Sequence, residues 1–103
     1  MSCSGGVIWV ICYHLSPIVQ AKRQAQKGNV EAQVELGMMY HTGEGTTQNY
    51  TESCKWFGMA ARQGNALGQN CLGAIYAEGL GVPGSASKAV MWYRKAAEQG
   101  LSQ

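Results

Sequence analysis

The chain contains a segment that is followed at once by a second copy of itself. Residues 29–64 and 65–100 are identical at 12 of 36 positions, and most of the shared residues are Gly, Ala, Leu, Trp or Tyr. These types set backbone conformation and packing. A period of this length is typical of stacked supersecondary units, each of which buries its apolar faces against its neighbours. The sequence therefore predicts a solenoid that acts through a surface rather than an enclosed pocket.

Each copy begins with the pattern of a helix that ends at a glycine. Apolar residues such as Leu36 recur at helical spacing and predict a first helix over about 30–41. Gly43 ends it, in the left-handed conformation that glycine adopts without strain. Gly37 lies inside this helix, where glycine costs about 1 kcal/mol relative to alanine, and Gly73 repeats it. A repeated cost predicts a close helix–helix contact that leaves no room for a side chain.

The second helix of each copy starts at a capping residue. Asn49 stands three residues before Glu52, which is the spacing of a capping box, and Ser85 holds the matching position in the second copy. Trp56 lies within the second helix, and we expect it to fill the core. Short connections make consecutive helices antiparallel, so each copy is predicted to be a helical hairpin.

A partial copy precedes the two full ones. Ser16-Pro17 is typical of a cap followed by proline at the first helical position. A helix over about 17–27 would end at Gly28, in register with Gly64. The expected organisation is an apolar N-terminal segment, 1–16, and a repeat domain, 17–103, that consists of the partial repeat 17–28 and the repeats 29–64 and 65–100.

Residues 7–13 form an apolar, largely β-branched run outside the repeat. The run is shorter than the roughly 20 residues that cross a bilayer, so we expect no membrane span. Three interpretations stay open: a signal peptide, although no Lys or Arg precedes the run; an apolar cap over an exposed end of the stack; or an atypical start of the chain. The cytoplasm is the favoured location, and a secreted or periplasmic one follows if residues 1–21 are a signal peptide.

Charge and cysteine usage argue against several classes of function. Charged residues make up 14% of the chain and the net charge is +2, against roughly 25% charged residues in a typical soluble domain. Strong attraction to nucleic acid is therefore not indicated. The four cysteines form no C-x-x-C pair, and no histidine stands at metal-ligand spacing from them, so we expect free thiols and no metal site. No cofactor is expected either.

The second copy contains three short motifs. They are Leu72-Gly73-x-x-Tyr76, Gly79-x-Gly81 and Lys88-Ala89-x-x-Trp92-Tyr93-x-x-Ala96-Ala97-x-x-Gly100. Together they resemble the Sel-1-like repeat family, whose members are relatives of tetratricopeptide repeats. The resemblance implies an all-α fold, a right-handed α/α superhelix of stacked helical hairpins. It also implies an adaptor or scaffold that holds a protein or peptide on its concave surface.

We expect no enzymatic activity and assign no catalytic residue. A cysteine-rich branch of the same family has been linked to β-lactam binding or hydrolysis, and Ser85-Ala86-Ser87-Lys88 has the S-x-x-K spacing of serine enzymes. The cap position already explains Ser85, and the chain contains no S-D-N or K-T-G partner motif. A β-lactam-binding or hydrolysing protein is therefore the remote alternative.

The candidate partner-binding surface is the face of the first helices opposite their apolar stripe. The resemblance implies that this face lines the concave side. Its weakly acidic and apolar character suits a peptide with Leu or Met anchors and a basic flank. The eight residues are Glu31, Glu35, Met38, Thr42, Leu67, Cys71, Ala74 and Glu78.

A structural role is the alternative function. Two full repeats are fewer than the three that stable stacks usually need. An assembly subunit would pair the exposed ends of its stack with a second copy, as a homo-oligomer.

Overall fold

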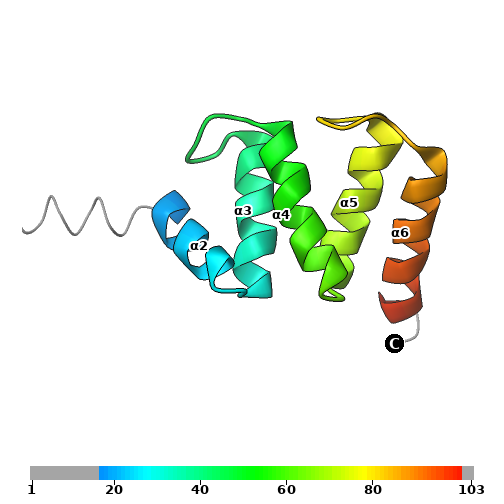
Figure 1. Ribbon diagram of the computed structural model, residues 1–103, viewed down its shortest axis with the longest axis horizontal. Helices are drawn as coiled ribbons and strands as arrows, with labels where there is room; N and C mark the ends of the chain where they lie inside the picture. The colour runs from blue at the N-terminus through cyan, green and yellow to red at the C-terminus, as the bar shows by residue number, and fades with distance from the viewer. Residues whose placement is uncertain (1–16, 101–103) are drawn as a thin grey trace, which may run out of the picture.

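The computed structural model describes residues 17–100, and within them it contains five helices and no strand. The helices are α2 (Pro17–Gln26), α3 (Val30–Thr42), α4 (Tyr50–Arg62), α5 (Ala66–Glu78) and α6 (Ala86–Gly100). They stand side by side in chain order, and each packs against its neighbours along the chain (Figure 1). The expected all-α stack of hairpins is confirmed, with α3–α4 and α5–α6 as the two hairpins. The apolar N-terminal segment, with Cys3 and Cys12, lies outside the described residues.

Asparagine side chains fix the starts of the three central helices. The Oδ1 atoms of Asn29, Asn49 and Asn65 each accept a hydrogen bond from the backbone N–H three residues later, at 2.7–3.1 Å. Of the two hydrogen bonds of the capping box expected at α4, only the one from the Glu52 N–H to the Asn49 side chain is formed. The Asn49 N–H donates to the carbonyl of Tyr40 at 2.8 Å rather than to the Glu52 side chain. That bond ties the start of α4 to α3.

Two kinds of glycine shape the hairpins. Gly43 and Gly79 end α3 and α5 in the left-handed conformation, with φ of 82° and 70°. Inside α3, a Cβ atom on Gly37 would lie 2.9 Å from the ring of Phe57 on α4. The close helix–helix contact predicted from the repeated glycine is confirmed. At the other end of the chain, Gly100 is the last residue of α6 rather than the residue after it.

The apolar core consists of two clusters, one between α2 and the first hairpin and one between the two hairpins. The first joins α2, α3 and α4 and includes Leu36 and Trp56, which are 0% and 4% exposed. Trp56 is therefore a core residue, as expected. The second joins α3, α4 and α5 and includes Phe57, Leu72 and Ile75. Each cluster needs helices from adjacent units, so the hairpins depend on each other for burial.

Buried glutamines cross the same junctions. Gln33 is fully buried, and its Nε2 donates to the carbonyl of Ala25 at 3.1 Å. Its Oε1 accepts from the side-chain amide of Gln63. One repeat later, Gln69 makes the same two bonds, at 3.1 and 2.9 Å. The carbonyls of Ala25 and Ala61 also accept the backbone N–H groups of Gly28 and Gly64, at 3.0 Å each. The glutamines therefore give each carbonyl a second partner, on the helix that packs over it.

Candidate functional site

A groove lies between α3 and α5, and α4 forms its base. Its volume is about 190 Å³. The two helices are the first helices of consecutive repeats, so they run parallel and present equivalent faces to the same side. The groove is lined by Met38, His41, Thr42, Phe57, Cys71, Ala74 and Ile75. This lining is largely apolar, with one imidazole, one hydroxyl and one thiol.

A second hollow, of about 300 Å³, adjoins the groove across α3. Met38 and Thr42 line both spaces, so these two side chains stand between the groove and the second hollow. The second hollow also contains the exposed carboxylates of Glu35 and Glu44. The surface therefore places an apolar depression directly beside two negative charges.

The structure brings together part of the surface predicted from the sequence. Five of the eight candidate residues line the groove or the acidic hollow, namely Glu35, Met38, Thr42, Cys71 and Ala74. Leu67 lines a separate hollow between α5 and α6. Glu31 and Glu78 are exposed and line none of these three spaces.

Four residues of this surface were not predicted from the sequence, namely His41, Phe57, Ile75 and Glu44. His41 follows Met38 by three positions, which places it on the same face of α3, and that spacing is a signal that could have identified it. Its Nδ1 is buried without a hydrogen-bond partner, and its ring meets that of Tyr50 edge-on, with centroids 5.3 Å apart. Phe57 gave no such signal, because it belongs to the other helix of the hairpin.

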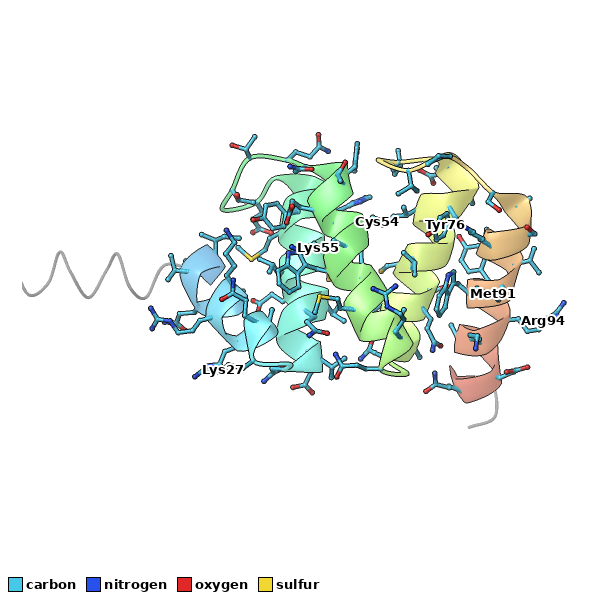
Figure 2. The ribbon with its side chains drawn as sticks, viewed as in Figure 1. Lys27, Cys54, Lys55, Tyr76, Met91 and Arg94 are labelled. Atoms are coloured by element: carbon cyan, nitrogen blue, oxygen red, sulfur yellow. The ribbon has the colours of Figure 1, made fainter. Side chains whose placement is uncertain are left out.

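Both cysteines in the described part of the chain are free thiols, as expected. Cys71 lines the groove, whereas Cys54 lies on α4, in the second core cluster beside α5 (Figure 2). Burial raises the pKa of each thiol, and the cation of Arg62 partly opposes the rise in the pKa of Cys54. Each thiol therefore behaves as a small apolar group at neutral pH.

The S-x-x-K sequence forms a helix cap. The Oγ atom of Ser85 accepts a hydrogen bond from the backbone N–H of Lys88 at 3.2 Å. The ammonium group of Lys88 lies 5.2 Å from the centre of the Tyr76 ring, within the range of a cation–π contact. The side chain of Lys88 thus contacts the Tyr76 ring on α5, and the side chain of Ser85 caps the backbone of α6.

Two further features are absent from residues 17–100, a metal site and a membrane-spanning helix. No three His, Cys, Asp or Glu side chains gather there in a way that would hold a metal ion. None of the helices in that range is both long enough and apolar enough to cross a membrane.

Comparison with known proteins gives two kinds of match. Residues 30–65 and 66–101 each match the family model of the Sel1 repeat. The crystal structure of c5321, a protective antigen of uropathogenic Escherichia coli strains with an SLR fold, is similar to 81% of the chain at 47% identity, with a TM-score of 0.80. A Sel1 repeat protein from Oxalobacter formigenes is similar to 81% of the chain at 38% identity, with a TM-score of 0.79. The chain spans 18% and 63% of the lengths of these two proteins. No curated protein sequence matches it.

Proposed function

Because the chain belongs to the Sel1 repeat family, whose repeats generally serve as protein–protein interaction scaffolds, we propose that it binds a partner protein or peptide across the groove between α3 and α5. One observation carries this proposal: an apolar depression and a pair of carboxylates lie side by side on one face. Peptide-binding surfaces of helical proteins commonly combine an apolar anchor site with a charged flank.

The dimensions and chemistry of the groove define the class of ligand. Its volume of about 190 Å³ is below the roughly 300–1,000 Å³ of small-molecule pockets, so it suits a single side chain of a longer ligand. Met38 is 48% exposed at its edge and provides an adaptable apolar contact. Glu35 and Glu44 favour a cation next to that contact. The ligand we propose is a segment with a Leu or Met anchor and a neighbouring Lys or Arg.

The contacts of Ser85 and Lys88 fit a structural role in a binding protein rather than a catalytic role. Sel1 repeat proteins are generally non-enzymatic helical scaffolds. Ser85 and Lys88 make the contacts of a helix cap and a ring partner rather than contacts with each other's side chains. Turnover of nitrocefin that is abolished by Ser85→Ala would contradict the absence of catalysis.

Selection of random displayed peptides on the wild-type chain tests the proposal. We expect the selected peptides to share an apolar anchor and a basic residue. Met38→Glu should weaken their binding by about tenfold or more, which corresponds to about 1.4 kcal/mol, and Glu35→Lys with Glu44→Lys should weaken the basic peptides most. Leu67→Asp is the matched control, since Leu67 is equally exposed but lines another hollow.

Circular dichroism establishes that each variant keeps its helices. The proposal fails if the selected peptides bind Met38→Glu as tightly as they bind the wild type. It also fails if Leu67→Asp removes binding while Met38→Glu retains it.

A further inference from the structure

Helix α6 repeats a surface that is covered elsewhere in the stack, and no other helix of residues 17–100 covers it there. On α4, Phe57 and Ala61 are each 2% exposed because α5 packs over them. Their counterparts on α6 are Tyr93, which is 39% exposed, and Ala97, which is half-buried. These two residues line an open hollow of about 530 Å³ between α5 and α6, at the end of the stack (Figure 1).

The hollow corresponds residue by residue to the place that α5 occupies one repeat earlier. Its lining residues are Ala66, Leu67, Asn70, Tyr93, Ala96, Ala97 and Gly100. Each stands 36 positions after one of Val30, Glu31, Val34, Phe57, Ala60, Ala61 and Gly64. Four members of the earlier set, Val34, Phe57, Ala60 and Ala61, form one core cluster with Leu72 and Ile75 of α5. Among the described residues, nothing takes the equivalent place on α6.

The two covered junctions show what kind of helix fits this surface. Where α5 crosses α4, a Cβ atom on Gly68 would lie 2.9 Å from the Cβ of Ala60, so the crossing needs a very small residue. Where α3 crosses α2, Ala32 holds that position. In both helices a glutamine follows and donates to a carbonyl of the helix beneath, at 3.1 Å.

Apolar residues complete the pattern. Leu36 and Leu72 stand four positions after the small residue, and Met39 and Ile75 stand seven positions after it. All four are buried in the core clusters. The fitting helix therefore has the sequence small-Gln-x-x-Leu-x-x-(Ile or Met), with the glutamine directed at the carbonyl of Ala97.

The two ends of the stack differ in a way that favours docking at α6. Exposed positions of α2 carry polar residues such as Lys22, Arg23 and Gln24, as terminal units of solenoids commonly do. Tyr93 of α6 is instead 39% exposed, and Val90 is 52% exposed although its counterpart Cys54 packs against the second core cluster. An apolar helix face of this kind is characteristic of a contact surface.

We propose that the hollow between α5 and α6 docks an α-helix of another protein that carries this pattern, in the position that α5 takes on α4. The contact would continue the interface that already joins the hairpins. A second copy of the chain is a less suitable source, since α3 and α5 are the helices with this pattern in the described residues and both are already packed.

The probe for this proposal is a labelled synthetic peptide with the sequence of residues 65–79. The substitutions Asn70→Lys and Ala74→Asp, joined by a lactam, keep this short peptide helical, and Cys71→Ser prevents disulfide formation. We expect saturable binding to the wild-type chain by fluorescence anisotropy. A peptide that also carries Gly68→Trp should bind at least about tenfold more weakly, because its side chain cannot fit against Ala96 and Ala97. This comparison leaves the protein unchanged.

Two protein variants locate the contact. Ala97→Arg should weaken binding of the peptide by about tenfold or more, whereas Ala77→Arg, the same substitution at an exposed position of α5 outside the hollow, should leave it unchanged. The proposal is overturned if the wild-type chain does not bind the peptide, or if both peptides or both protein variants bind alike. It is also overturned if sedimentation shows a dimer that Ala97→Arg dissociates, because that result assigns the hollow to a second copy.

Discussion

Gly37 sets how closely the two helices of the first hairpin approach. The ring of Phe57 lies against the backbone of α3 at this point, in the space that a Cβ atom would need. At the same crossing the Oγ of Ser53 donates to the carbonyl of Gly37 at 2.8 Å. The ring of Phe57 also forms the base of the groove. A single glycine thus links the packing of the hairpin to the shape of the candidate site.

We expect Gly37→Ala to lower the free energy of unfolding by about 1–3 kcal/mol, because the added methyl group overpacks the Phe57 ring. This loss outweighs the roughly 1 kcal/mol by which alanine favours a helix over glycine. The matched control is Gly58→Ala on α4, where the new Cβ meets the mobile guanidinium of Arg62 at 3.3 Å. That variant should be neutral or more stable. Urea denaturation measures both, and equal effects would contradict the close contact.

Alkylation rates report the burial of the two described thiols. Burial raises the pKa of Cys54 and Cys71, so at any given pH a smaller fraction of each is the reactive thiolate than in an unfolded chain. We expect iodoacetamide to modify both slowly at neutral pH, and the rates to rise at a higher pH than for the chain in urea. Mass spectrometry of the tryptic peptides gives the two rates. Equal pH profiles for folded and unfolded chains would show that the thiols are not buried.

The helices themselves follow from local pattern, and most of their features were predictable. Apolar spacing predicted α3, and the caps predicted the starts of α4 and α6. The buried glutamines were not predicted, because a polar side chain is normally expected at the surface and its partners lie on a helix of the preceding unit. Gln33 and Gln69 do repeat at 36 positions, so the internal repeat was the available signal.

Removal of Gln33 tests its role in joining α2 to the first hairpin. Gln33→Leu removes one hydrogen bond from the carbonyl of Ala25 and one from the side-chain amide of Gln63, although each group keeps a second partner. A hydrogen bond contributes about 0.5–1.5 kcal/mol net, so the loss of two bonds should lower the free energy of unfolding by about 1–3 kcal/mol. Gln20→Leu is the control, because Gln20 is exposed on α2. Identical urea midpoints for the two variants would exclude a stabilising role for Gln33.

The candidate surface was predicted in part, for a geometric reason. The sequence pattern identifies the outward face of each helix over its whole length. The groove forms where the C-terminal parts of α3 and α5 lie over Phe57. Leu67 stands in the first turn of α5, seven residues before Ala74, which is about 10 Å along the helix at 1.5 Å per residue. It therefore lies near the other end of α5, beyond the groove, where it lines a different hollow.

At the scale of the whole molecule, stability is expected to be highest in the centre of the stack. Helices α3, α4 and α5 each pack against two neighbours, whereas α2 and α6 each pack against one within the described residues. Ala89 is the one buried residue of α6. Local opening costs least where few apolar contacts are broken. Hydrogen exchange should therefore be slowest in α4 and faster in α2 and α6, and equally slow exchange in α6 and α4 would contradict this gradient.

Methionine methyl groups provide the most direct test of where a partner binds. Met38 stands at the edge of the groove, and Met91 is similarly exposed on α6, away from it (Figure 2). In a chain labelled with ¹³C at the methionine methyls, a selected peptide should shift the NMR signal of Met38 and leave that of Met91 in place. A shift of the Met91 signal with no change at Met38 would contradict binding in the groove between α3 and α5.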